Sequence, residues 1–244
     1  MYIIGDIGNT DIKVCLVNKK YNIIKKKIFN TNKVSNKYLY KNLNFLLKHK
    51  KLIKKAIVCS VVPSKYLILK KFFKINLSIK CLELKSLNLD KYIKITVNKK
   101  QVGSDRIANA LSVIDNNNNY IIIDFGTATT FDVVKKNRYL GGIIAPGVDM
   151  SLKNLINKAS LIPKVKLTKS KNILGKNTKD AVNSGFYWGY IGLINNIIKL
   201  IIKDSNSMYK IKITGGFAYL FKNSIEYICE LDKDITLKGL IKLL

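Results

Sequence analysis

One short pattern of residues occurs twice in this chain, each time directly after a run of apolar residues. The first copy runs from Asp6 to Thr10 (Asp-Ile-Gly-Asn-Thr), and the second runs from Asp124 to Thr130 (Asp-Phe-Gly-Thr-Ala-Thr-Thr). A glycine lets backbone N–H groups approach an anion closely, hydroxyl and amide side chains add donors, and a carboxylate at a strand end can hold a cation. The repeated pattern therefore predicts two turns that bind a metal-bound polyphosphate.

A single turn of this kind is weak evidence of function, because Asp and Gly are common in tight turns for backbone reasons alone. The two copies, however, start at Asp6 and Asp124, about half the chain length apart. A third glycine turn, Gly215-Gly216, follows another apolar run near the C-terminus. This spacing favours two related lobes, each carrying one of the repeated turns.

Short apolar runs surround both turns and predict the strands that position them. The expected strands are residues 2–4, 12–17, 23–29, 56–62, 79–84, 120–123, 131–134 and 211–214. Apolar residues at helical spacing predict helices over residues 38–47, 66–73, 107–114, 150–158, 179–203 and 217–221. Residues 139–147 are rich in glycine, and we expect them to form a loop.

The polar run from Asn116 to Asn119 separates the helix at 107–114 from the strand before the second turn. Such a run predicts a loop, and it is too short for a disordered linker. We therefore place the lobe boundary at this run. Residues 1–115 would form an N-terminal lobe, and residues 116–244 would form a C-terminal lobe that includes the long helix at 179–203.

The charge of the chain is strongly basic, with 44 basic and 15 acidic residues and a net charge of +29. Only Arg106 and Arg138 are arginines, so the excess is almost entirely lysine. Base readout and bidentate phosphate binding favour arginine over lysine. We therefore expect a lysine-rich solvated surface, and we consider a nucleic-acid partner unlikely.

The cysteines and the single histidine exclude several classes of site. The four cysteines have no C-x-x-C spacing, so they predict reduced thiols and neither a zinc site nor a disulfide framework. The only histidine, His49, lies among lysines, which disfavours mechanisms that need an imidazole. The first turn begins within a few residues of the N-terminus, and lysines interrupt the apolar stretches, so we expect a cytoplasmic protein without a membrane span.

The arrangement of two such turns is similar to that in the superfamily of sugar kinases, heat-shock ATPases and actin, in which ATP lies between two lobes. Within it the chain resembles type III pantothenate kinases, because three motifs occur in that family's order. They are Asp6 to Lys13, Gly103 to Arg106 (Gly-Ser-Asp-Arg) and Asp124 to Thr130. The resemblance implies an α/β fold with two ribonuclease H-like lobes, each a mixed β-sheet with flanking helices, and an ATP cleft between them. Supporting motifs are Ser60 to Pro63, Gly141 to Gly147, Gly175 to Thr178, Thr214 to Gly216 and Leu237 to Leu240.

The same resemblance gives the two turns different tasks. The first would hold the phosphates of ATP, with Asp6 close to hydrated Mg²⁺. Asp124, in the second, would coordinate a monovalent cation, K⁺ or NH₄⁺. The residues expected to bind ATP are Asp6, Ile7, Gly8, Asn9, Thr10, Asp11, Ile12, Lys13 and Thr127.

Phosphoryl transfer to an alcohol also needs a carboxylate that orients or deprotonates the hydroxyl. The resemblance gives this task of general base to Asp105, and it pairs Arg106 with the carboxylate of pantothenate. An arginine kept in a lysine-rich chain fits this role, because an ammonium group cannot replace a bidentate guanidinium. In the structural alternative Asp105 only caps a helix. The residues expected to bind the substrate are Gly103, Ser104, Asp105, Arg106, Thr178 and Thr96.

Thr96 marks a departure from the family, whose members usually carry a tyrosine nine residues before the catalytic acid. The resemblance thus implies a homodimeric kinase that converts pantothenate to 4′-phosphopantothenate, the first step of coenzyme A biosynthesis. Two other functions stay open. One is a nucleic-acid-binding or regulatory protein on the same scaffold, suggested by the charge, and the other is a phosphohydrolase of the same superfamily that uses water as acceptor.

Overall fold

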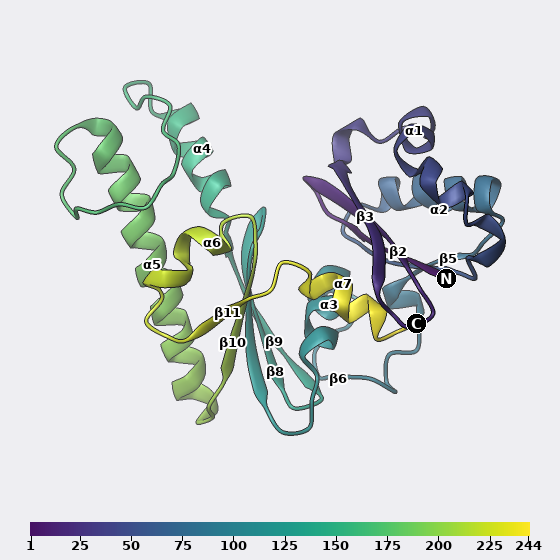
Figure 1. Ribbon diagram of the computed structural model, residues 1–244. Coiled ribbons are helices and arrows are strands. Elements are labelled where there is room, and N and C mark those ends of the chain that lie inside the picture. The colour runs from purple at the N-terminus through teal and green to yellow at the C-terminus, as the bar shows by residue number, and fades with distance from the viewer. The chain divides into compact units, whose positions relative to one another are not determined.

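The computed structural model describes residues 1–244 (Figure 1), and the chain divides into two units. The first unit consists of Met1–Ile114, Asn137–Tyr139 and Asp234–Leu244. The second unit consists of Asp115–Lys136 and Leu140–Lys233.

The first unit contains a five-stranded mixed sheet with the order β3-β2-β1-β4-β5. The first three strands form an antiparallel meander, β4 pairs in parallel with β1, and β5 pairs in parallel with β4. The bounds are β1 (Tyr2–Ile7), β2 (Asp11–Val17), β3 (Ile23–Asn30), β4 (Ala56–Ser60) and β5 (Cys81–Glu83). The short β6 (Lys94–Ile95) pairs with Arg138 and Tyr139, which also belong to this unit.

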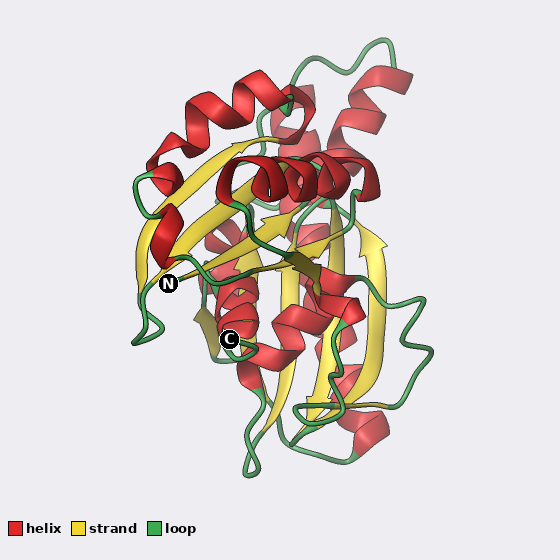
Figure 2. Ribbon diagram, turned by 90° about the vertical axis from the view of Figure 1, so that its right-hand side faces the viewer, coloured by secondary structure: helices red, strands yellow, loops and turns green.

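Helices cover both faces of this sheet (Figure 2). On one face, α1 (Asn36–Leu47) and α2 (Pro63–Leu77) bury apolar side chains against alternate residues of the strands, such as Ile3 and Ile7 of β1. The opposite face carries Asp6 and packs against α3 (Ser104–Val113) and α7 (Ile235–Ile241). The alternation of side chains along β1 therefore separates the apolar core from the candidate acidic residue.

The second sheet repeats this plan, with the order β11-β10-β7-β8-β9-β6, in which the last strand is the β6 already described. The strands are β7 (Asn119–Phe125), β8 (Ala128–Lys135), β9 (Arg138–Pro146), β10 (Lys210–Gly215) and β11 (Cys229–Leu231). As in the first sheet, the central hairpin is antiparallel and the next two strands are parallel. The α-helices of this unit are α4 (Val148–Lys158), α5 (Thr178–Ser205) and α6 (Ala218–Phe221). The whole chain also has short 3₁₀ helices at Thr31–Lys33, Lys50–Leu52, Leu84–Ser86 and Lys222–Ser224.

The α/β prediction is confirmed, and each predicted helix and strand has a counterpart in the structure. The prediction of a loop over 139–147 is wrong, because these residues lie almost entirely in β9. Only Gly141 in this strand has a positive φ, at 119°, so a single irregular residue interrupts an otherwise extended segment. The β-branched pair Ile143 and Ile144 also suits a strand.

The predicted lobe ranges differ from the two observed units mainly at the C-terminus. The first unit's long N-terminal segment ends at Ile114, close to the predicted boundary at residue 115. Asp234–Leu244, however, belong to the first unit, whereas the prediction placed them in the C-terminal lobe. A Cβ on Gly239 of α7 would lie 1.8 Å from the carbonyl oxygen of Ala108 in α3, so the two helices approach very closely at this glycine.

One helix, α5, is long and apolar enough to cross a bilayer by length and composition, although lysines were expected to interrupt every such stretch. A single helix of this kind is weak evidence of a membrane span, because the core helices of water-soluble proteins pass the same test. Tyr187, Ile191, Ile194 and Ile198 of α5 pack into the core of the second unit.

Candidate active site

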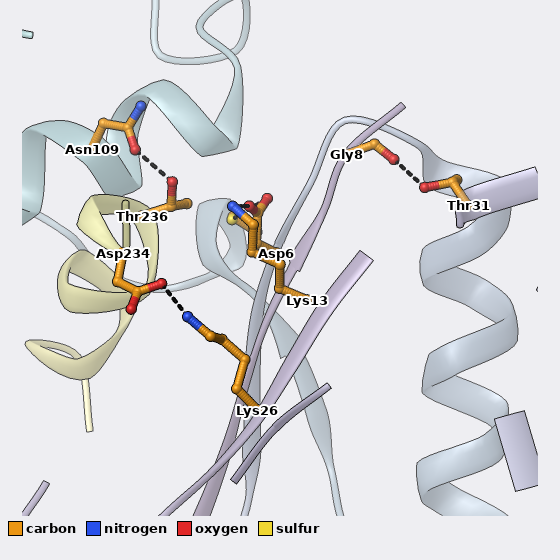
Figure 3. Close-up of polar contacts among 9 residues, drawn as sticks. Asp6, Gly8, Lys13, Lys26, Thr31, Asn109, Asp234 and Thr236 are labelled. Carbon is orange, nitrogen blue, oxygen red and sulfur yellow. Dashed lines mark hydrogen bonds and ion pairs between the residues drawn. The ribbon is translucent and has the colours of Figure 1, made fainter. Parts of the chain in front are cut away.

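The first turn joins β1 to β2 and keeps an acid and a base opposite each other. The antiparallel register pairs Asp6 with Lys13, and Lys13 Nζ lies 3.3 Å from Asp6 Oδ2 (Figure 3). At the tip, the N–H of Gly8 donates to the carbonyl of Asp11 over 3.0 Å. Thr31 Oγ1 donates to the carbonyl of Gly8 over 2.7 Å. Hydrogen bonds from two sides thus hold the turn above the ion pair.

The other predicted ATP-binding residues of this turn fall into two groups. Ile7 and Ile12 are buried in the core of the first unit, so their side chains hold the turn in place and do not face a phosphate. Asn9, Thr10 and Asp11 are exposed at the tip. An exposed amide and hydroxyl beside a glycine peptide can donate to phosphate oxygens, and the carboxylate at the base can hold a hydrated divalent cation.

The predicted general base lies in the first turn of α3. Its carboxylate oxygen Asp105 Oδ1 accepts a hydrogen bond from the backbone N–H of Arg106 over 2.8 Å. A Cβ on Gly103 would lie 2.4 Å from the same oxygen, so the carboxylate occupies space that only a glycine leaves open. The N-cap of α3 is Gly103, which means that Asp105 does not cap this helix.

Burial raises the pKa of Asp105, and the negative charge of Asp6 adds to this rise. The backbone N–H and the guanidinium of Arg106 oppose it. A carboxylate with a raised pKa accepts a proton more readily near neutral pH, as a general base must. The electrostatic effect of Asp6 also indicates that the two acids lie near each other in the first unit.

Ser104 was predicted to bind the substrate, but its hydroxyl is engaged elsewhere. Ser104 Oγ donates to the carbonyl of Ser60 over 2.8 Å and accepts from the N–H of Ser60 over 2.7 Å. The side chain is 1% exposed. Its hydroxyl therefore ties the start of α3 to the end of β4.

Thr96 is exposed, but its hydroxyl donates to the carbonyl of Tyr139 over 2.9 Å. The backbone N–H of Thr96 donates to the same carbonyl over 3.1 Å. The threonine thus extends the pairing of β6 instead of replacing the aromatic surface of the family's tyrosine. Tyr92, the nearby aromatic residue, is 42% exposed.

The second turn joins β7 to β8 in the second unit, and it surrounds Asp124 with oxygen atoms. The antiparallel register places Asp124 opposite Thr130, whose buried Oγ1 has no hydrogen-bond partner. On the other side, the parallel register places Thr214 of β10 beside Asp124. A carboxylate with neighbouring hydroxyl oxygens is a suitable donor set for a hard cation.

Two glycines from distant segments hold this second turn. A Cβ on Gly147 would lie 2.1 Å from the carbonyl oxygen of Thr127. A Cβ on Gly215, whose φ is +90°, would lie 2.6 Å from Asp124 Oδ1. The three glycine-rich segments that stand far apart in the sequence therefore meet at one place, and Thr127 remains exposed beside them.

Thr178 also belongs to the second unit, where it is the first residue of α5. Asn177 caps this helix by accepting a hydrogen bond from the N–H of Asp180 over 3.0 Å. Thr178 itself is exposed. The predicted substrate residues are thus divided between the two units.

Cys59 and Ser60 at the end of β4 were not predicted as site residues, although both lie beside the candidate acids. Cys59 Sγ lies 3.6 Å from Asp6 Oδ1, and Ser60 bonds to Ser104. The signal in the sequence that could have identified them is their place at the end of an apolar strand, shortly before Pro63. The motif from Ser60 to Pro63 was recognised only as part of the family pattern.

Comparison with known proteins identifies the family. The sequence model described as type III pantothenate kinase matches residues 2–200. A type III pantothenate kinase from Pelagibacter ubique is 57% identical over 242 residues, which cover 99% of this chain and 98% of that protein. Another, from Fusobacterium nucleatum, is 34% identical over 257 residues and also covers 99% of this chain and 98% of that protein.

Solved structures of more distant proteins share the fold. A Campylobacter jejuni protein assigned to the Baf family of transcriptional activators has a TM-score of 0.61 at 22% identity, covering 99% of this chain and 96% of that one. A protein assigned as a sugar kinase from Cytophaga hutchinsonii has a TM-score of 0.54 at 12% identity, covering 100% and 99%. These likenesses confirm the predicted sugar-kinase type of fold. The family itself is shown by the sequence matches along the whole chain: this protein belongs to the type III pantothenate kinase family.

Proposed function

We propose that this enzyme uses Asp105 as the general base when it transfers the γ-phosphoryl group of ATP to the primary hydroxyl of pantothenate. The reaction, phosphorylation of pantothenate in coenzyme A biosynthesis, follows from its family. The observation that supports the assignment of the base is the buried carboxylate of Asp105, whose pKa is raised and whose position depends on the absence of a side chain at Gly103.

The other residues of the first unit would bind and orient the two substrates. Asn9, Thr10 and the backbone of the first turn would donate to the ATP phosphates. Arg106 would pair with the carboxylate of pantothenate, which would direct the hydroxyl end of the substrate toward Asp105. Asp105 would take the hydroxyl proton at its carboxylate as the oxygen attacks phosphorus. Gly103, Ser104 and Thr96 of the first unit and Thr178 of the second unit are the other residues to which we assign substrate binding, as the family pattern implies.

Two cations complete this proposal, and the residues present fit both. Asp6 would lie near hydrated Mg²⁺, which neutralises charge on the phosphates when bound. Asp124 would hold K⁺ or NH₄⁺ together with oxygen atoms of its neighbours, and the orphaned hydroxyl of Thr130 is a candidate ligand. Thr127, exposed beside Asp124, would donate to the ATP phosphates.

We also propose that the enzyme is a cytoplasmic homodimer. The segment before Thr178 exposes large apolar side chains that a second copy of the chain could cover. They are Leu161, 92% exposed, Ile173, 66% exposed, and Leu174, 80% exposed. Sedimentation of the purified protein at several concentrations would test this assembly.

The reaction is tested by ADP release from the purified enzyme. Release should require pantothenate, Mg²⁺ and either K⁺ or NH₄⁺ together. Release of phosphate without pantothenate would instead support the phosphohydrolase alternative. Activity that is equal in Na⁺ and in K⁺ would refute the monovalent-cation proposal while leaving the kinase reaction intact.

A further inference from the structure

We propose that the end of β4 positions both candidate carboxylates of the first unit. The thiol of Cys59 orients Asp6. The backbone of Ser60 orients Asp105 through the side chain of Ser104. This inference rests on the tasks proposed above for Asp6 and Asp105, and it assigns a positioning role to two adjacent residues that make no predicted contact with a substrate.

The first part concerns Asp6, which two neighbouring strands hold from opposite sides. In the parallel register of β1 and β4, Cys59 lies directly beside Asp6. Cys59 is 0% exposed, and its Sγ lies 3.6 Å from Asp6 Oδ1. The other carboxylate oxygen, Oδ2, faces Lys13 Nζ from β2 at 3.3 Å. Each oxygen of the carboxylate thus has its own partner, which fixes the rotation of the group.

The thiol of Cys59 can act as the donor in this contact, because Sγ lies 3.6 Å from Asp6 Oδ1 and a carboxylate oxygen only accepts. A protonated thiol is a weak hydrogen-bond donor, whereas a thiolate would repel the carboxylate.

The second part concerns Asp105, which follows the first residue of α3. Ser104 Oγ both donates to and accepts from the backbone of Ser60, over 2.8 Å and 2.7 Å. Two bonds to one residue restrict rotation as well as distance, so the first turn of α3 is fixed to the end of β4. Asp105 is thereby fixed relative to the strand that also carries Cys59.

The two contacts arise from adjacent residues of one strand, so they couple the positions of the two acids. β4 is paired on both sides, with β1 and with β5. A strand in the interior of a sheet is a rigid base for a catalytic group. The geometry therefore predicts separate effects: loss of the Cys59 donor should weaken the ATP side of the site, and loss of the Ser104 bonds should slow the proton transfer at Asp105.

The test compares Cys59→Ala and Ser104→Ala in the full-length enzyme, with kcat and KM measured for ATP and for pantothenate. Cys59→Ala should raise the KM for ATP up to about tenfold with little change in kcat, because one hydrogen bond to a charged group is lost. Ser104→Ala should lower kcat about tenfold and leave the KM for ATP unchanged. All rates are expressed per folded enzyme, with the folded fraction taken from thermal melting, so a merely structural role would leave the corrected kcat and both KM values unchanged.

Conservative variants and a matched control sharpen this comparison. Cys59→Ser keeps a donor and should restore the KM for ATP toward the wild-type value. Cys81→Ala removes a thiol that is 4% exposed in the neighbouring strand β5, so it should lower the melting temperature similarly without a kinetic effect. If Ser104→Ala does not fold, Ser104→Cys keeps the shape with a weaker donor and should still lower kcat. Equal kinetics of Cys59→Ala and Cys81→Ala, or a folded Ser104 variant with wild-type kcat, would overturn the proposal.

Two further variants separate this inference from the proposed function. Asp6→Asn and Asp105→Asn remove the carboxylates themselves, so both should lose most of the turnover. If they remain active, the proposed roles of the acids fail. If they are inactive while the Cys59 and Ser104 variants behave as wild type, only the positioning by β4 fails.

Discussion

Replacement of Gly103 by alanine should displace the Asp105 carboxylate while leaving the fold nearly unchanged. The new Cβ would lie 2.4 Å from Asp105 Oδ1, whereas ordinary van der Waals contact begins at 3.4 Å. The carboxylate must therefore move by about 1 Å. Gly103 has a φ of −58° and a ψ of 140°, which alanine adopts without strain. The side chain of Asp105, and not the backbone, is expected to give way.

A displacement of this size is large for catalysis and small for stability. A misplacement of about 1 Å can cost about 100-fold in rate, so we expect kcat to fall about 100-fold at saturating ATP and pantothenate. The KM for ATP should stay near its wild-type value, because the first turn is untouched. Alanine at an N-cap costs about 1 kcal/mol or less relative to glycine, which corresponds to a fall of about 4 °C at most in Tm.

The assay is ADP release measured beside thermal melting of the same preparations. Gly192→Ala is the matched control, because nothing lies within 4 Å of the position that its Cβ would take. This control should keep the wild-type kcat. A folded Gly103→Ala enzyme with a kcat within about twofold of wild type would refute the argument that the carboxylate position limits the reaction.

Burial raises the pKa of Asp105, so the folded protein loses stability as the pH rises through that pKa. The variant Asp105→Asn should therefore have a higher melting temperature than wild type near pH 7, although it should lose turnover. In the wild type, kcat/KM should fall on acidification with a midpoint above the usual aspartate range, and a midpoint near 4 would contradict a raised pKa of the base. Gly239→Ala forces α7 away from Ala108 and should lower the free energy of unfolding in urea by about 2 kcal/mol; unchanged unfolding would show that the helices adjust freely. Asp124→Asn should abolish the difference between K⁺ and Na⁺ in the ADP-release assay, and a retained difference would place the cation elsewhere. The lysine-rich surface should bind DNA weakly at physiological salt; tight binding with a steep salt dependence would revive the nucleic-acid alternative.

The strands and the order of the elements were predictable because the local pattern matches the final environment. The runs at 14–17 and 120–123 are apolar in the sequence and buried in the structure. β9 was missed because its glycines suggest a loop, whereas pairing with β8 keeps the segment extended despite Gly141. The place of α7 was also missed. Its close approach to α3 depends on one glycine, and no local pattern reveals which helix that glycine will meet.

The sequence predicted the candidate site residues that lie in short motifs. It did not predict residues whose role depends on a contact with a residue far away in the sequence. Asp6, Asp105 and Asp124 each lie in a short recognisable pattern. The double hydrogen bond between Ser60 and Ser104 joins residues 44 positions apart, so only the folded sheet brings them together. Sequence reasoning therefore gave Ser104 a substrate contact, whereas the structure shows a hydroxyl that is already used within the protein.

The two copies of the turn have different neighbours, which agrees with the different tasks proposed for them. Both copies end a central strand that has an antiparallel partner on one side and a parallel partner on the other, but the residues at the matching positions differ. Asp6 lies between Lys13 and Cys59, which are donors. Asp124 lies between Thr130 and Thr214, whose hydroxyls can act as acceptors. A lysine and a thiol can only orient the carboxylate, whereas hydroxyl oxygens can also join a carboxylate in coordinating a cation. The neighbouring strands, and not the repeated motif itself, therefore distinguish the turn of the first unit from that of the second.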